Sequence, residues 1–200
     1  MSMSSTNTDC LNRRSAQNHN IKYLILIPAY NAAVYLAELV SRVKKSISGA
    51  DILIINDGST DRTSELLPTL DVISLSNQVN QGKGYSLNRG FRYAIENNYD
   101  YCITIDADLQ HLPEELPLFP AESGRLDICL GTREISLKSM PPARWLTNNL
   151  TSLIISILSG CRIRDSQSGY RMMATDLLEN LKIKSMKYDF ESELLLQAGA

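Results

Sequence analysis

Short apolar runs alternate along this chain with segments whose apolar residues recur at helical spacing. Residues 23–27 and 51–55 contain unbroken runs of large aliphatic side chains, which are typical of strands buried on both faces of a sheet. Residues 34–48 and 82–97 instead show the spacing of amphipathic helices. Three further strands are predicted, at residues 72–75, 101–105 and 127–130. This order predicts an α/β domain with a mostly parallel sheet flanked by helices.

The size and charge of the chain narrow the classes of protein it can belong to. Its 200 residues suit one domain with a sizeable core, and 44% hydrophobic with 21% charged residues is ordinary globular composition. The formal net charge is -2, without the basic excess of a general nucleic-acid-binding surface. We therefore expect no nucleic-acid partner.

Targeting and redox signals point to a cytoplasmic location. Residues 1–20 are polar and lack an apolar central stretch, so we expect a disordered tail rather than a signal peptide, followed by one domain over residues 21–200. The 4 cysteines form no CxxC pair, which favours a reducing compartment. The longest uncharged stretch, residues 145–161, contains Asn148 and Asn149 and is shorter than the roughly 20 apolar residues a membrane span needs.

Polar clusters follow the ends of the predicted strands. Pro-Ala-Tyr-Asn at residues 28–31, Asn-Asp at 56–57 and Asp-Ala-Asp at 106–108 each come directly after an apolar run. In open α/β sheets ligands bind beyond the carboxyl ends of the strands. The sequence therefore predicts a binding site at this edge of the sheet.

Asp106 and Asp108 are the candidate metal-binding residues. Two carboxylates separated by one residue can converge on a hard cation where the backbone turns, and Gln110 can add a third oxygen while water or a diphosphate supplies the rest. Such a metal neutralises charge that develops on a leaving group. The alternative is a chance acidic pattern in a loop, but the position after a buried strand favours the metal site.

Two other segments have both a structural and a functional interpretation. The segment 56–61 is a turn that can cap the next helix, while Asp57 itself is placed to accept hydrogen bonds from a nucleobase. Residues 80–84, Asn-Gln-Gly-Lys-Gly, resemble a phosphate-binding loop before a helix but equally a plain glycine-rich turn. They lack the P-loop order, so an ATPase is disfavoured, and neither His19 nor His111 belongs to a recognisable hydrolase constellation.

The second half of the chain is rich in arginine. Guanidinium groups suit the bidentate binding of phosphates, although solvated surface positions are the simpler interpretation. Residues 144–158 have amphipathic spacing, which favours a core-facing helix, with a membrane-surface helix or a dimer contact as alternatives. The arginines in question are Arg133, Arg144, Arg162, Arg164 and Arg171.

Taken together, these segments resemble the inverting glycosyltransferase family 2, with its GT-A fold, and most closely its dolichyl-phosphate mannose synthase and polyprenyl-phosphate glycosyltransferase branch. Seven blocks carry the resemblance in the family's order over residues 22–198. They are Ile-Pro-Ala-Tyr-Asn at 27–31, Ile-Asn-Asp-Gly-Ser-Thr-Asp at 55–61, Asn-Gln-Gly-Lys-Gly at 80–84, Asp-Ala-Asp-Leu-Gln-His at 106–111, Gly-Thr-Arg at 131–133, Asp-Ser-Gln-Ser-Gly-Tyr-Arg at 165–171 and Phe-Glu-Ser-Glu-Leu at 190–194.

The resemblance implies a role for each candidate residue. The nucleotide-sugar donor would be bound by Pro28, Tyr30, Asp57, Lys83, Asp106 and Ala107. Asp108 and Gln110 would hold Mg2+ or Mn2+, and Arg133 and Arg144 would face the acceptor phosphate or the diphosphate. Asp165 would stand near the reacting centre, as a positioning group for a phosphate acceptor or as the general base for a hydroxyl acceptor. Asp106, Asp108, Asp165 and Arg133 would be the catalytic set.

The implied function is transfer of a sugar from a GDP- or UDP-linked donor to a polyprenyl or dolichyl phosphate at the cytoplasmic face of a membrane, in cell-envelope biogenesis. Transfer to a saccharide hydroxyl in a cell-surface polysaccharide, and a non-catalytic nucleotide-sugar-binding subunit, are the alternatives. Two departures from the family bear on this expectation. Ala32 stands where the family usually has Glu, and the sequence stops at Ala200, so we expect a domain shorter at its C-terminal end than in relatives. A homo-oligomer or a membrane-subunit partner is compatible with this reading.

Overall fold

The computed structural model describes residues 21–123, 127–131, 168–181 and 190–198, together with Thr151, Leu153 and Ser156. The predicted tail at residues 1–20 and nearly all of the predicted helix at 144–158 lie outside the described residues. Six strands form one sheet in the described part of the chain. They are β1 (Tyr23–Ala29), β2 (Asp51–Asn56), β3 (Ile73–Ser76), β4 (Tyr101–Thr104), β5 (Ile128–Leu130) and β6 (Arg171–Ala174).

The sheet has the strand order β3-β2-β1-β4-β6-β5. Strands β1 to β4 pair in parallel, whereas β6 runs antiparallel to both β4 and β5. The prediction of an α/β domain with a mostly parallel sheet is therefore confirmed. Strand β6 was not predicted, because its four residues follow a polar block and show no long apolar run.

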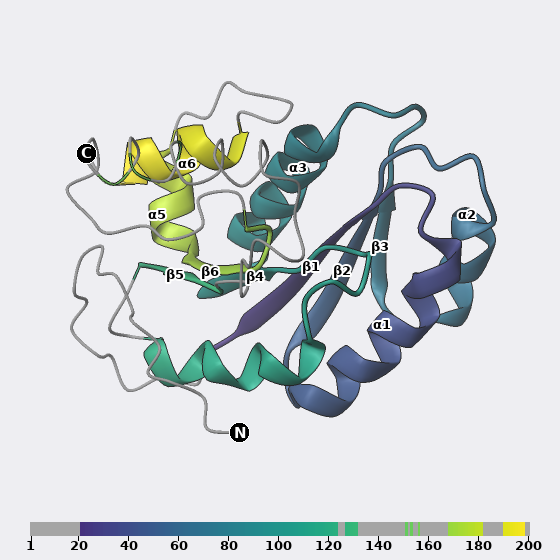
Figure 1. Ribbon diagram of the computed structural model, residues 1–200, viewed down its shortest axis with the longest axis horizontal. Helices are drawn as coiled ribbons and strands as arrows, with labels where there is room; N and C mark the ends of the chain where they lie inside the picture. The colour runs from purple at the N-terminus through teal and green to yellow at the C-terminus, as the bar shows by residue number, and fades with distance from the viewer. Residues whose placement is uncertain are drawn as a thin grey trace.

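Helices cover both faces of the sheet (Figure 1). One face packs against α1 and the short helix η2, and the other packs against α3, α5 and α6. Among the described residues no helix is long and apolar enough to cross a membrane. The helices are α1 (Ala33–Ser46), α2 (Thr63–Leu66), α3 (Lys83–Glu96), α5 (Thr175–Asn180) and α6 (Phe190–Ala198), with 3-10 turns η1 (Leu67–Thr69), η2 (Pro113–Leu118) and η3 (Pro120–Glu122).

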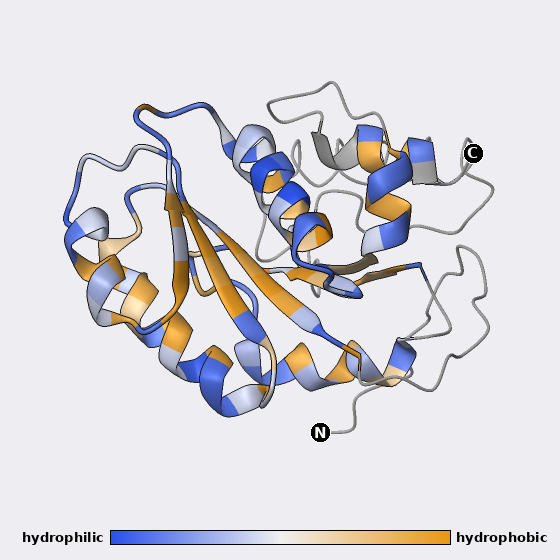
Figure 2. Ribbon diagram, turned by 180° about the vertical axis from the view of Figure 1, so that it is seen from behind, coloured by the Kyte–Doolittle hydropathy of each residue, from blue (hydrophilic) through white to orange (hydrophobic). Residues whose placement is uncertain are grey.

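Successive side chains of β1 point to opposite faces of the sheet and contribute to both halves of the core. Ile25 and Ile27 pack on the α1 side, whereas Leu24 and Leu26 pack on the α3 side, and all four are fully buried. Figure 2 shows the central strands as mostly hydrophobic and the helices as mixed, as expected for elements with one apolar side. The two apolar faces of the strands thus fix where the helices pack.

Helix α3 lies unusually close to β1. A Cβ atom added at Gly90 would stand 2.9 Å from the Cγ atom of Leu26, so only glycine allows this approach. The helix begins at Lys83, directly after Gly82, whose φ is 96°. The close packing therefore fixes where the side chain of Lys83 starts.

The order in which strands join the sheet changes side at β1. Strands β2 and β3 are added on one side of β1, and β4 pairs with its other side, so that Leu26 lies opposite Thr104. The backbone N–H of Ile105 continues this pairing by donating to the carbonyl of Leu26 at 3.1 Å. The carboxyl ends of β1 and β4 therefore meet at a topological switch point, where α/β sheets bind ligands.

The first helix is capped by a loop that follows another strand. The two Asp61 carboxylate oxygens accept from the N–H of Ala33 at 3.1 Å and from the N–H of Thr63 at 2.9 Å, which lie in the first turns of α1 and α2. Burial raises the pKa of the Asp61 carboxyl, but hydrogen bonds from Thr63 and Ala33 outweigh it and hold the pKa below its ordinary value. The carboxylate of Asp61 thus accepts from one N–H at the start of each helix, while the N-cap residues themselves, Ala32 and Arg62, make no side-chain cap hydrogen bond.

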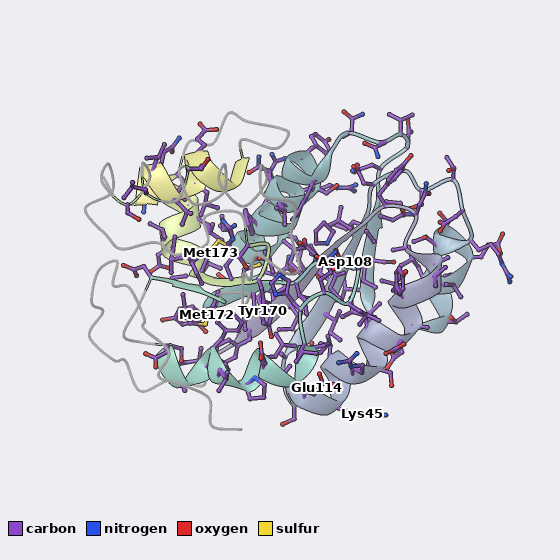
Figure 3. The ribbon with its side chains drawn as sticks, in the orientation of Figure 1. Lys45, Asp108, Glu114, Tyr170, Met172 and Met173 are labelled. Carbon is purple, nitrogen blue, oxygen red and sulfur yellow. The ribbon has the colours of Figure 1, made fainter. Side chains whose placement is uncertain are left out.

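An exposed ion pair joins α1 to η2 below the sheet. The guanidinium of Arg42 donates to both carboxylate oxygens of Glu114, at 2.8 and 2.7 Å, and to Glu38 at 3.2 Å. Figure 3 labels Glu114 at the start of η2. The hydrogen bonds from Arg42 lower the pKa of the Glu114 carboxyl to about 2.

Glu114→Gln tests this link between α1 and η2. A lowered folded pKa means that the carboxylate stabilises the fold above its unfolded pKa, near 4.5, and that this contribution disappears as the pH falls toward about 2. We expect the variant to melt below the wild type at pH 7, by no more than about 3 °C, because the pair is exposed. Thermal unfolding between pH 7 and pH 2.5 measures the difference.

Glu38→Gln is the control, because Glu38 contacts Arg42 through one oxygen only and should change the melting temperature less. A Glu114→Gln difference that stays constant across the whole pH range would contradict the assignment.

Candidate active site

An ion pair stands at the switch point. The ammonium of Lys83, the first residue of α3, lies 2.7 Å from Oδ1 of Asp106, two residues beyond the last residue of β4. The two side chains are 38% and 27% exposed, so the pair is accessible to a ligand from solvent. The structure thus brings together two residues predicted from separate segments.

Asp57 organises the loop that leads into Lys83. Its Oδ1 accepts from the N–H of Gln81 at 3.0 Å and from the side-chain amide of Asn77 at 2.7 Å, and its Oδ2 accepts from the N–H of Gly82 at 2.8 Å. Asp57 is only 4% exposed. The sequence did not reveal this role, since the partners lie 20–25 residues further along the chain.

A second contact fixes the same loop between Asn77 and Gln81. A Cβ atom added at Gly58 would stand 2.6 Å from the backbone nitrogen of Asn80, and the φ of Gly58 is 66°. Both the space and the backbone angle therefore require glycine at this position. The glycine-rich segment at residues 80–84 is thus held against the end of β2 by Asp57 and Gly58 together.

The end of β1 forms the opposite rim of the site. Asn31 has a φ of 51°, and its side-chain oxygen accepts from the N–H of Thr60 at 2.8 Å, which ties this turn to the segment after β2. Tyr30 is 49% exposed, while Pro28, the second-last residue of β1, is half-buried. Ala32, which stands where Glu was expected, is buried, and its N–H donates to Oγ1 of Thr63 at 2.9 Å.

Asp108 and Gln110 lie on an exposed turn after β4. The N–H of Gln110 donates to Oδ1 of Asp108 at 3.0 Å, and Leu109 between them has a φ of 59°. Ala107 is half-buried, whereas Asp108 and Gln110 are exposed. In the part of the chain that the structure describes, no group of 3 or more His, Cys, Asp or Glu side chains could hold a metal ion. A cation bound here must therefore take ligands from elsewhere.

Residues 168–171 lie directly beneath this turn. The ring of Tyr170 lies 5.0 Å from that of His111, between centroids, at a tilt of 37°, and it meets Phe119 edge-on at 4.8 Å. Its hydroxyl donates to the carbonyl of Leu112 at 3.3 Å. Figure 3 labels Tyr170 and Asp108 in this region. Burial raises the pKa of the Tyr170 hydroxyl, so this group stays protonated as a donor. The aromatic contacts place residues 168–171 beside the segment that follows the acidic turn.

Several predicted site residues lie outside the described part of the chain. They are Arg133, Arg144 and Asp165. The described residues bring together the ends of β1, β2 and β4 with the start of α3, and these positions carry the remaining candidates: Pro28, Tyr30, Asp57, Lys83, Asp106, Ala107, Asp108 and Gln110.

Comparisons with known proteins agree with this architecture. A family model described as glycosyl transferase family 2 matches residues 24–181. An undecaprenyl-phosphate mannosyltransferase of Micrococcus luteus is 28% identical over 190 residues, covering 90% of this chain and 78% of that protein. A polyprenol monophosphomannose synthase of Mycolicibacterium smegmatis is 28% identical over 188 residues, covering 88% of this chain and 71% of that protein.

Solved structures give the same fold. The crystal structure of glucosyl-3-phosphoglycerate synthase from Mycobacterium tuberculosis with Mn2+, UDP-glucose and phosphoglyceric acid superposes with a TM-score of 0.69 at 19% identity. The match covers 88% of this chain but only 64% of that one, so this chain spans less than two thirds of its length. Since the family model matches most of the chain and the fold agrees, the chain belongs to glycosyl transferase family 2 and is a glycosyltransferase with a GT-A fold.

Proposed function

We propose that the chain transfers a sugar from a nucleotide-diphospho-sugar to a polyprenyl phosphate, with inversion at the anomeric carbon. The observation that carries the proposal is the Lys83–Asp106 ion pair beside the exposed Asp108 turn, at the switch point of the sheet. The names of the Micrococcus luteus and Mycolicibacterium smegmatis relatives support the lipid-phosphate acceptor. In the transfer, an acceptor phosphate oxygen bonds to the anomeric carbon as the nucleoside diphosphate leaves with the electrons of the broken C–O bond.

The donor binds between the ends of β1 and β2 and the start of α3. Pro28 and Tyr30 line the nucleoside pocket, Tyr30 with a half-exposed ring that can stack on a base. Asp57 faces the base and at the same time holds the loop that begins α3. Lys83 and Asp106, with Ala107 beside them, contact the diphosphate and the sugar, where a cation and an anion next to each other can bind a phosphate oxygen and a sugar hydroxyl.

The residues of the acidic turn fit a divalent cation. Asp108 and Gln110 both offer oxygen, the ligand that Mg2+ and Mn2+ prefer, and both are exposed. Because they are too few to enclose the ion, the donor diphosphate must complete the coordination. When bound, the metal stabilises the negative charge of the departing diphosphate.

The acceptor side of the site belongs to the second half of the chain. A lipid phosphate is already ionised at neutral pH and needs no general base, so Arg133 and Arg144 bind its charge and Asp165 positions the reacting groups. A saccharide hydroxyl would instead require Asp165 as a base. Peripheral contact with a membrane follows from the lipid acceptor.

The test incubates the protein with UDP- or GDP-linked sugars, each with Mn2+, Mg2+ or chelator, and with undecaprenyl phosphate. A labelled sugar that moves into the organic phase, only with metal, supports the proposal. A product that stays in water after incubation with an oligosaccharide acceptor favours the saccharide alternative. Nucleotide binding without transfer to any acceptor would make the chain a binding subunit.

Asp108→Asn should remove turnover without removing the fold. Losing the carboxylate costs several kcal/mol of charge stabilisation, equivalent to a rate lower by about a hundredfold or more. The asparagine oxygen can still accept from the N–H of Gln110, so the free energy of unfolding should change by less than about 0.5 kcal/mol. Initial rates and urea unfolding measure the two effects.

Asp71→Asn is the matched control, since Asp71 is an exposed aspartate with a φ of 49° whose carboxylate pairs with Lys44, before the start of β3. An Asp108→Asn variant that turns over as fast as this control would contradict the assignment of Asp108 as a metal ligand.

Asp57→Asn should weaken both stability and donor binding. An amide group in place of one carboxylate oxygen faces a backbone donor of the 77–82 loop, and a mismatched buried hydrogen bond costs about 1–3 kcal/mol. Urea unfolding and calorimetric titration of UDP and GDP measure the effects.

Asp51→Asn serves as the control at the opposite end of β2, because among the described residues its side chain accepts from the Tyr99 hydroxyl, and an amide oxygen can replace that acceptor. Equal stability of the Asp57 and Asp51 variants would contradict the role of Asp57 in the loop.

A further inference from the structure

Gly169 lies against the carboxylate of Asp106, although the two are 63 residues apart in the sequence. A Cβ atom added at Gly169 would stand 2.6 Å from Cγ and 2.7 Å from Oδ1 of Asp106, and closer still to Oδ2. Real Cβ atoms essentially never come within 3.0 Å of such atoms. Any L side chain at position 169 therefore collides with this carboxylate.

The backbone of Gly169 does not itself require glycine. Gly49, Gly58 and Gly82 are the described glycines with a positive φ, and Gly169 is not among them. A left-handed φ therefore does not exclude alanine at this position. The constraint on position 169 is thus the space taken by Asp106 and not a turn.

The segment around Gly169 cannot retreat from the collision. The hydroxyl of Thr104, the last residue of β4, donates to the carbonyl of Gly169 at 2.7 Å. Ser168 donates to the carbonyl of Gly131 at 2.6 Å, and the N–H of Gly131 donates to the carbonyl of Tyr170 at 2.8 Å. Arg171, which is 2% exposed, donates to the carbonyl of Ser168 and pairs with Thr104 in the sheet.

The Asp106 side chain, in contrast, can move. It is 27% exposed, and the ion pair that holds it on the other side ends in the flexible side chain of Lys83. A methyl group at position 169 would therefore be accommodated by moving the carboxylate. The displacement would change its position relative to Lys83, whose backbone is fixed at the start of α3.

We propose that Gly169 is a positioning residue for Asp106. Its missing side chain leaves the space in which the carboxylate lies, so that Asp106 meets Lys83 on one side and a bare backbone on the other. The sugar-donor contacts of Asp106 then depend on a residue that touches no substrate. The catalytic consequence rests on the proposed function, but the steric relation between the two residues does not.

Thermal unfolding of a double-mutant cycle tests the steric relation without any assay of activity. Gly169→Ala in the wild-type background should lower the melting temperature by about 3–10 °C, the usual effect of forcing a methyl group into filled space in a chain of this size. In an Asp106→Ala background the space is vacant, and the same substitution should change the melting temperature by less than about 1 °C.

An equal loss in both backgrounds would show that the methyl group meets something other than Asp106, and would overturn the proposal. If Gly169→Ala alone fails to fold, recovery of a folded protein in the double variant supports it, and failure of both overturns it.

Activity gives the second readout. Gly169→Ala should lower kcat by about tenfold to a hundredfold, because a carboxylate displaced by about 1 Å no longer contacts the donor in the productive position. Gly49→Ala is the matched control: the φ of 82° at Gly49 makes alanine strained there, but a Cβ atom would meet nothing within 4 Å, so its folded fraction should keep the wild-type kcat. Equal kcat values for the two variants would contradict the positioning role.

The two readouts separate the two proposals. A wild-type protein that transfers no sugar to any acceptor would refute the proposed function, while the melting temperatures of the cycle would still decide the role of Gly169.

Discussion

The parallel pairing of β1 with β4 is the constraint on which the site depends. Because β2 occupies one side of β1, β4 pairs with the other side of β1, and the carboxyl ends of β1 and β4 then lie next to each other. The backbone hydrogen bond from Ile105 to Leu26 fixes their register up to the residue before Asp106. The polar clusters at the strand ends are far apart along the chain, and the pairing of the strands brings them together at the site.

Two carboxylates act on the same short segment from different strands. Asp57, after β2, holds the backbone of Gln81 and Gly82, and Asp106, after β4, pairs with the side chain of Lys83. The loop before α3 therefore lies between the two acids, with its N–H groups turned to one and its ammonium to the other. A ligand that binds at this loop is therefore in reach of groups from both strands at once.

Much of this arrangement could be predicted from local patterns. The apolar runs located β1, β2 and β4 because buried parallel strands are apolar on both faces, and the polar ends of these strands located the site. Strand β6 has only four residues and follows a polar block, so its pattern of apolar residues is too short to indicate a strand. The partners of Asp57 and Gly169 could not be predicted, since their contacts depend on how distant segments pack and not on residue spacing.

The approach of α3 to β1 at Gly90 has a mechanical consequence. With the helix backbone seated on the side chain of Leu26, α3 cannot turn about its own axis without driving a neighbouring residue into the sheet. Helix α3 is therefore rigidly placed, and its rotation cannot adjust the site to a ligand. On the α3 side of the site, adjustment must then come from the torsions of the Lys83 side chain, whose unbranched four-carbon stem allows its ammonium to follow a charged group while the helix stays in place.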